Sequence, residues 1–181
     1  MGRRRKRRSG IAGVLLETGL FILAVLVLAF LLSRYVVERV EVHNHSMEHT
    51  LENNDSVLID KISYRFRDPK RFDIIVFRQS GTGEELVKRV IGLPGETVQI
   101  TDGVIYIDGE DISDTEGLDA PEYAGLAASP VKLSSGEYFV LGDNRKESID
   151  SRYEEVGTVA STRITGRVFI RLLPVARMKL F

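Results

Sequence analysis

The sequence contains no cysteine, so the available nucleophiles are serine, threonine, lysine or a metal-bound water. Its three histidines, His43, His45 and His49, stand close together and beside Ser46. On a strand, His43 and His45 would share one face, a spacing suited to two zinc ligands, with His49 or Glu48 as a third. Neighbours on a strand point to opposite faces, which argues against His45 as a base for Ser46. Histidines on a solvated surface loop are the alternative, favoured because no separate acidic ligand motif accompanies them.

A lysine offers a different kind of base. Over residues 84–91, apolar side chains alternate on both faces of a predicted strand, so either Lys88 or Arg89 projects among apolar neighbours. A solvated lysine, with a pKa of about 10.4, is only about 0.1% neutral near pH 7.5, so it is a poor base until burial lowers that pKa. Strand lysines also commonly extend to water, so this pattern alone leaves both interpretations open.

Charge and hydropathy divide the chain into three segments. The formal net charge is only −1, but residues 3–8 carry six bases, which leaves 19 bases against 26 acids elsewhere. Residues 11–32 are almost continuously apolar and would form a helix of roughly 33 Å, close to the bilayer core of about 30 Å. A cleavable signal peptide usually has a shorter apolar core and a small-residue cleavage site, so we expect an uncleaved anchor.

The basic cluster beside this span predicts a cytoplasmic N-terminus and argues against a nucleic-acid partner. The predicted organisation is a cytoplasmic basic arm at residues 1–10, a transmembrane signal anchor at 11–33 and an extracytoplasmic β-rich domain at 34–181.

The body is predicted to be mainly β. Alternation from Val36 to Val42, and the β-branched runs at residues 56–60 and 72–77, indicate strands. Asp102-Gly103 between two alternating runs predicts a type I′ hairpin, and Asp108-Gly109 marks a second turn. Later strands are expected at 138–141 and 167–172. Residues 111–131, rich in turn-forming residues, are expected to form a long surface excursion.

Four segments carry a resemblance to a known family. S-M-E-H-T-L at residues 46–51 resembles the S-M-x-P-T-L box of bacterial type I signal peptidases, and D-S-V-L-I-D-K at 55–61 resembles their next box. Residues 88–96 match K-R-V-I-G-x-P-G-E, and residues 142–152 match G-D-N-R-x-x-S-x-D-S-R. The four boxes occur in the family's order behind one anchor, and the last two are long enough to be specific.

The resemblance implies a membrane-bound serine endopeptidase that cleaves signal peptides from exported preproteins after small residues, of the A-x-A type. Carried over by position, Ser46 is the nucleophile of a Ser/Lys dyad that forms an acyl-enzyme, and Lys88 is the general base. The backbone N–H of Ser46 would donate to the oxyanion, with the Asn44 amide as a second donor inferred from its chemistry. Ser148 resembles the serine that orients the lysine.

The resemblance also implies supporting residues and a substrate groove. Asp150 and Arg152 resemble a structural ion pair near the site, which Arg89 could join. Met47 and His49 belong to the box that shapes the groove. His49 replaces the family's proline, and the loss of a fixed φ angle is expected to loosen that turn. On this reasoning, His49→Pro should preserve or raise cleavage.

The expected fold is a signal-peptidase-like antiparallel β catalytic domain after one transmembrane helix, with no cofactor and no metal. The expected partners are signal peptides and the lipid bilayer, for a monomer linked functionally to the secretion translocon. The expected location is the cell membrane, single-pass, with the catalytic domain on the outer face. The alternatives are a non-catalytic membrane-tethered peptide-binding module of the same fold and a self-cleaving Ser/Lys protease. The anchor and the absence of a DNA-binding module argue against the second.

Overall fold

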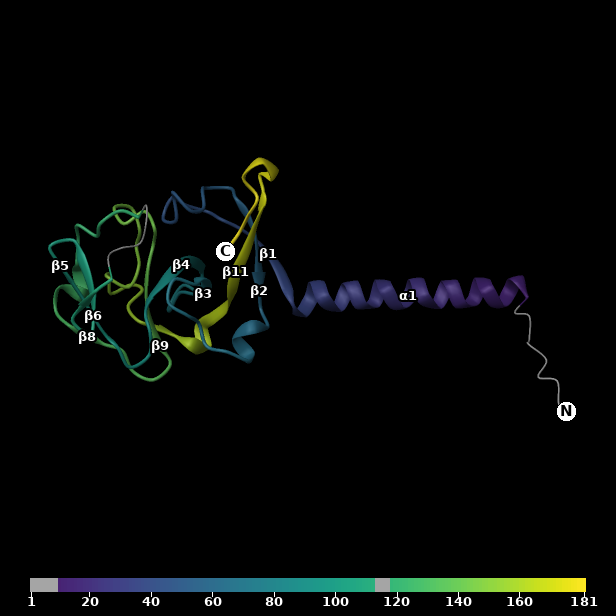
Figure 1. Ribbon diagram of the computed structural model, residues 1–181, viewed down its shortest axis with the longest axis horizontal. Helices are drawn as coiled ribbons and strands as arrows, with labels where there is room; N and C mark the ends of the chain where they lie inside the picture. Colours follow the sequence, from purple (N-terminus) through teal and green to yellow (C-terminus); the bar gives the residue numbers. More distant parts are fainter. Residues whose placement is uncertain (1–9, 113–117) are drawn as a thin grey trace. The chain divides into compact units, whose positions relative to one another are not determined.

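The computed structural model describes residues 10–112 and 118–181, and it divides into two compact units, Met1–Val36 and Val37–Phe181. The first contains one helix, α1 (Ile11–Tyr35) (Figure 1). Residues 11–31 of α1 have a mean hydropathy of 2.7 and none of that window is buried, so its apolar side chains have no protein core to pack against. The basic arm at residues 3–8 lies outside the described residues.

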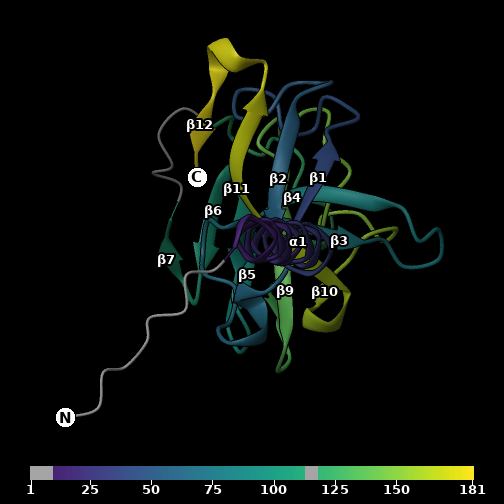
Figure 2. The ribbon, with the colours of Figure 1, turned by 90° about the vertical axis from the view of Figure 1, so that its right-hand side faces the viewer.

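The second unit is built on two antiparallel sheets, which confirms the predicted fold class. The larger sheet has eight strands in the order β1-β2-β11-β3-β4-β9-β10. The eighth strand, β12, pairs with β11, and the two lie side by side in Figure 2. Its strands are β1 (Val37–Glu41), β2 (Ser56–Asp60), β3 (Ile74–Arg78), β4 (Glu85–Gly92), β9 (Glu137–Leu141), β10 (Val159–Ala160), β11 (Ile164–Leu173) and β12 (Lys179–Leu180). β4 lies between β3 and β9, so both of its edges are hydrogen-bonded.

The smaller sheet has four strands in the order β7-β6-β5-β8. They are β5 (Thr97–Thr101), β6 (Val104–Ile107), β7 (Glu110–Asp111) and β8 (Val131–Lys132). The predicted β5–β6 hairpin is confirmed, since Asp102 and Gly103 both have positive φ angles, 51° and 79°, as a type I′ turn requires. Within the second unit, the smaller sheet lies at the end away from β1 and β2 (Figure 1).

Short 3-10 helices complete the second unit: η1 (Ser63–Arg65), η2 (Gly125–Ala128), η3 (Ser161–Arg163) and η4 (Val175–Arg177). The expected excursion at 111–131 contains η2, with Ala127 buried in the core, and β8 at its end, so part of it packs rather than lying on the surface. Its residues 113–117 lie outside the described residues.

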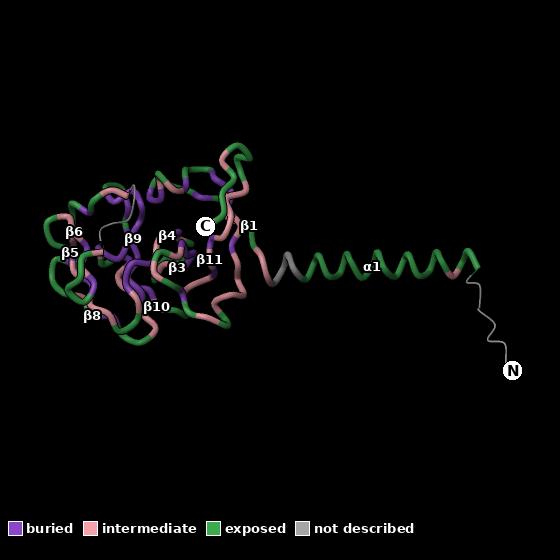
Figure 3. Tube along the Cα trace, viewed as in Figure 1, coloured by how far each residue is buried: buried purple, intermediate pink, exposed green. Residues whose placement is uncertain are grey.

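Three apolar clusters fill the body, and β4 contributes to all of them. The buried stretches of the chain, purple in Figure 3, run through this β body. Val87 packs in the first cluster, Ile91 in the second, and Val90 with Leu86 in the third. Alternation along β4 therefore sends its side chains to opposite faces, as the sequence predicts, and both faces are covered. A basic residue in this strand is consequently placed in a protein interior.

Candidate active site

Ser46 and Lys88 meet in the body although 42 positions separate them in the sequence. Lys88 Nζ donates a hydrogen bond to Ser46 Oγ at 2.6 Å, and the two residues are only 2% and 6% exposed. Lys88 comes from the middle of β4, and Ser46 from a turn between β1 and β2. A hydroxyl in contact with a buried amine has the arrangement that nucleophilic catalysis by a Ser/Lys pair requires.

Burial lowers the pKa of Lys88 from 10.5 to about 8, because desolvation penalises its charged form. Two nearby carboxylates, Asp150 and Asp143, act in the opposite direction, while the Arg152 guanidinium lowers the pKa further. A lysine with such a pKa holds an appreciable neutral fraction near pH 7.5, which a solvated lysine does not. The environment therefore converts Lys88 into an available base.

The Asn44 side chain shows the opposite polarity to the one predicted. Its carboxamide oxygen accepts hydrogen bonds from the Ser46 backbone N–H at 3.1 Å and from the Ser46 hydroxyl at 2.7 Å. Because a backbone N–H can only donate, the oxygen rather than the NH₂ group faces Ser46. In this arrangement Asn44 occupies the N–H that an oxyanion would use, and donation from its amide to an oxyanion stays a prediction.

Ser148 lies close to the dyad, but its hydroxyl has no hydrogen-bond partner among the described residues and it is 1% exposed. The predicted orienting contact with Lys88 is therefore not formed here. Gly142 permits the close packing, since a Cβ at that position would lie 2.1 Å from Ser148 Oγ and 2.4 Å from the Ser46 carbonyl oxygen. Any side chain at position 142 would push the nucleophile loop away from Ser148.

Two ion pairs lie beside the dyad. Arg152 pairs with Asp150, both without exposed side-chain surface, through bonds of 2.8 and 2.9 Å. Arg89 instead binds Asp143 through two hydrogen bonds of 2.8 and 2.5 Å. It therefore does not join the Asp150–Arg152 pair, which the sequence analysis had allowed. Asp143 therefore matters to the site, although no role was predicted for it. Its place in the last motif box was the available signal.

The loop that carries Ser46 is joined to that last box by Asn144. The Asn144 backbone N–H donates to the Ser46 carbonyl oxygen and its side chain to the His45 carbonyl oxygen, both at 3.1 Å. The His45 ring contacts Glu48, whose hydrogen bond raises the pKa of His45. These contacts fix the nucleophile turn against the segment that also supplies Ser148.

The histidines lie on a solvated surface loop, as the favoured alternative predicts: β1 ends at Glu41, and His43, His45 and His49 are exposed in irregular backbone. Among residues 10–112 and 118–181, no group of three or more potential ligands is arranged to hold a metal ion. His49 instead contacts Asp119 at 3.6 Å.

A cavity of about 490 Å³ opens onto the dyad. Its apolar walls include Leu86 and Ile149, and three glutamates also line it: Glu84, Glu147 and Glu155. None of these five side chains stood out in the sequence, because partly exposed apolar residues and exposed acids occur throughout any surface.

Comparisons with known proteins show the family of this chain. The family model described as "Signal peptidase, peptidase S26" matches residues 15–173. "Probable signal peptidase I-2" of Synechocystis sp. (strain ATCC 27184 / PCC 6803 / Kazusa) is 36% identical over 97% of this chain and 81% of its own length. This chain belongs to the signal peptidase S26 family.

Two further signal peptidases are similar to this chain. Signal peptidase I of Leptolyngbya laminosa is 39% identical over 84% of this chain and 76% of its own length. A crystal structure of a signal peptidase I from Enterococcus faecalis V583 is 35% identical and covers 56% of this chain and 97% of that chain, with a TM-score of 0.45. The predicted family is confirmed: the chain is a membrane-anchored serine endopeptidase of the signal peptidase type.

The segment around the nucleophile differs from the S-M-x-P-T-L motif at His49, which stands in place of proline, and its backbone at that position is one that proline cannot adopt. His49 has a φ angle of 77°, a region closed to proline, whose ring holds φ near −65°. The expectation that His49→Pro is harmless is therefore revised. Of the two residues predicted to shape the groove, Met47 is fully buried in the first apolar cluster, and neither it nor His49 lines the cavity that opens onto the dyad. Their part in a substrate groove stays a prediction.

Proposed function

We propose that this signal peptidase cleaves preproteins with Ser46 as nucleophile and Lys88 as general base. The observation that carries the proposal is the 2.6 Å contact between Lys88 Nζ and Ser46 Oγ, at a lysine whose burial lowers its pKa to about 8. Neutral Lys88 accepts the Ser46 hydroxyl proton as Oγ attacks the scissile carbonyl carbon.

The proton that Lys88 holds then passes to the departing amine as the peptide bond breaks, which leaves the signal peptide esterified to Ser46. Lys88, neutral again, takes a proton from a water that attacks this ester. Collapse of the second tetrahedral intermediate frees the signal peptide carboxylate and returns the proton to Ser46 Oγ. The two half-reactions balance, so no cofactor enters the proposed cycle.

Asn44 has to change its contacts before the oxyanion forms. At rest its oxygen accepts the Ser46 hydroxyl and backbone N–H, so the proton of the nucleophile points away from Lys88. When Lys88 loses its proton, the Ser46 hydroxyl can donate to it instead. We infer that the carboxamide then rotates, which frees the Ser46 N–H and turns its own NH₂ group toward the oxyanion.

The cavity suits small substrate residues beside an extended peptide. Leu86 and Ile149 give the cavity apolar walls next to the dyad, and exposed glutamates line the rest of it. Shallow apolar contacts favour alanine-sized side chains at the positions that precede the cut, which supports the A-x-A preference.

For topology, we propose a single-pass protein of the cell membrane with residues 1–10 in the cytoplasm, α1 across the bilayer and the β body on the outer face. The basic cluster at residues 3–8 supports this orientation. We further propose that the enzyme acts as a monomer that receives preproteins from the secretion translocon.

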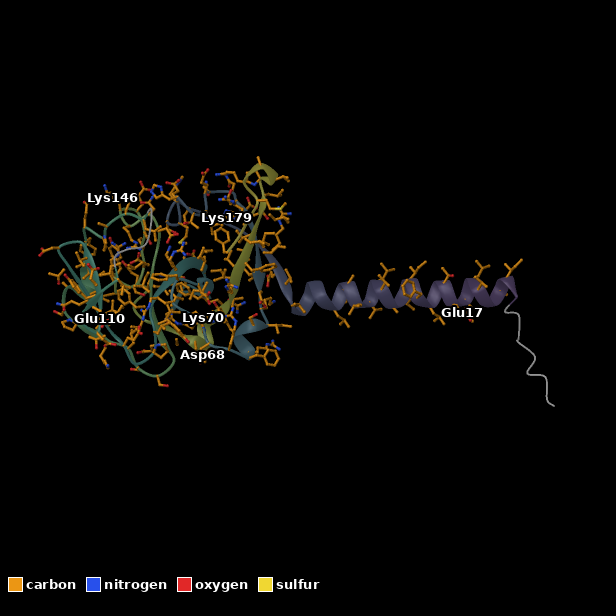
Figure 4. All side chains as sticks on the ribbon, viewed as in Figure 1. Glu17, Asp68, Lys70, Glu110, Lys146 and Lys179 are labelled. Carbon is orange, nitrogen blue, oxygen red and sulfur yellow. The ribbon has the colours of Figure 1, made fainter. Side chains whose placement is uncertain are left out.

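Conversion of a purified preprotein by the full-length enzyme in detergent tests the dyad. Ser46→Ala and Lys88→Ala should each reduce conversion by at least about 10⁴-fold, since each removes a group that acts in the same step. Glu110→Gln, which changes an exposed residue of β7 (Figure 4), is the control and should retain wild-type conversion. Full activity of either dyad variant would refute the assignment, and peptide binding without turnover by the wild type would favour a non-catalytic module.

A further inference from the structure

A second cavity, of about 400 Å³, adjoins the catalytic cavity and shares Glu155 with it. Tyr123, Leu126 and Tyr153 supply its apolar and aromatic walls, and Glu154 also lines it. Tyr123 and Leu126 are 53% and 41% exposed, so the fold leaves these wall residues open rather than filling the cavity with its own side chains. A peptide that lies across both cavities can contact surface beyond the residues that surround the dyad.

The two tyrosines form a fixed aromatic pair. Their ring centroids are 5.0 Å apart, and the Arg152 guanidinium lies 5.9 Å from the Tyr153 centroid. Arg152 Nη1 also donates to the Tyr123 carbonyl oxygen at 3.1 Å, while Asp150 neutralises the buried Arg152 charge. The ion pair beside the dyad thus holds the aromatic wall in place. The open ring surfaces can attract a further cation.

Carboxylates surround the path between the cavities. Glu84 and Glu147 line the catalytic cavity, Glu154 lines the second, and Glu155 belongs to both. All four are exposed, and none forms an ion pair with another side chain in the part of the chain that the structure describes. These exposed like charges raise the free energy of the unoccupied groove, which the interaction of Glu147 with His45 offsets at one position only, and a cationic ligand would relieve the repulsion.

We propose that the second cavity binds a lysine or arginine side chain of the preprotein substrate, close to the scissile bond. Aromatic faces next to carboxylates match the chemistry of a basic side chain, whose apolar stem lies on the rings while its charge meets the acids. Because the cavities share one residue and an extended peptide advances about 3.3 Å per residue, the basic residue lies roughly two to four positions from the cut. This inference rests on the proposed function, since it assumes that the peptide passes Ser46.

The consequence is a charge preference among substrates. Preproteins with a basic residue at the matching position should bind more tightly than those with an acidic one, and the difference should appear in KM more than in kcat. Because the glutamates are exposed, salt should weaken the preference.

The test uses the full-length enzyme in neutral detergent and one preprotein in which Lys, Gln or Glu is placed in turn at each position flanking the cut. At one or two positions we expect kcat/KM for Lys to exceed that for Glu by about tenfold at low salt, and to fall toward equality near 0.5 M salt. A ratio below twofold at every position would overturn the proposal.

Variants assign the effect to this cavity. The double variant Glu154→Gln with Glu155→Gln, and separately Tyr123→Ala, should reduce the Lys/Glu ratio at least threefold, whereas Tyr123→Phe and the control Glu110→Gln should keep it. A ratio that survives in both the double variant and Tyr123→Ala would contradict the assignment.

Binding of fluorescent peptides to Ser46→Ala separates this inference from the proposed function. Peptides carrying Lys at the matching position should bind more tightly than their Glu counterparts, whether or not the wild type turns them over. Equal binding of the Lys and Glu peptides would refute the charge preference even if cleavage occurs. Failure of the wild type to cleave any of them would instead refute the proposed function.

Discussion

The two halves of the dyad come from regions of very different regularity. Lys88 lies in the middle of β4, a strand hydrogen-bonded on both edges and packed in apolar clusters on both faces. Ser46 lies in a turn that contains Asn44 and His49, both non-glycine residues with positive φ angles, 121° and 77°. The sheet holds the base in place. Polar contacts hold the nucleophile turn in place, although two of its residues have unfavourable backbone angles.

The largest effects should come from Lys88, which acts as the base in catalysis and whose buried charge opposes folding. Lys88→Met should abolish cleavage and yet stabilise the protein. The folded-state pKa of about 8 lies below the value of 10.5 expected for an unfolded chain, so burial of the charged lysine opposes folding. This cost, about 3 kcal/mol, is complete below pH 8 and disappears as the pH rises toward 10.5.

Denaturation of wild type and Lys88→Met in detergent at pH 6.5 and pH 10 measures this difference. The variant should be more stable at pH 6.5 and lose most of that advantage at pH 10. Lower stability of Lys88→Met at pH 6.5 would indicate that Lys88 contributes to packing rather than opposing folding.

The next largest effect should come from the nucleophile loop. Asn44→Asp keeps the acceptor toward Ser46 but removes the side-chain NH₂ group that would donate a hydrogen bond to the oxyanion, so kcat should fall by about 10²–10³-fold with little change in KM. Asn44→Ser, which can both donate and accept, should retain more activity. Equal rates for wild type and Asn44→Asp would exclude the carboxamide rotation.

The smallest effect should test the backbone of the same loop. His49→Pro cannot keep a φ angle of 77° and should lower the free energy of unfolding by about 2 kcal/mol, with reduced cleavage. His49→Gly accepts that angle and should stay within about 0.5 kcal/mol of wild type. If His49→Pro matched wild type in both stability and cleavage, the loop would not need its positive φ.

This contrast explains what the sequence could predict. The limits of β2 and the hairpin at Asp102-Gly103 follow from local alternation and turn chemistry, so they could be predicted. Alternation also predicted that Lys88 or Arg89 lies among apolar side chains, but it left open which of the two is buried, and the structure shows that it is Lys88. The pairing of Lys88 with Ser46 was predicted only from the resemblance of the four motif boxes to the family, because no local pattern indicates it.

The turn around Ser46 was less accessible. Long-range contacts with Asn144 hold the carbonyl oxygens of His45 and Ser46, and packing against the first apolar cluster buries Met47. The Ser46 backbone N–H sets the polarity of the Asn44 carboxamide. Glu154 and Glu155 likewise line a cavity that exists only because distant segments meet. Residues of these kinds carry no periodic signal that could reveal their roles.

The pH dependence of kcat/KM for one preprotein, measured with the full-length enzyme in detergent, tests the central claim most directly. If neutral Lys88 is the base, kcat/KM should rise with pH through an apparent pKa near 8, because only the deprotonated amine accepts the Ser46 proton. A rate that stays constant from pH 6 to pH 9, or that falls through this range, would contradict the account.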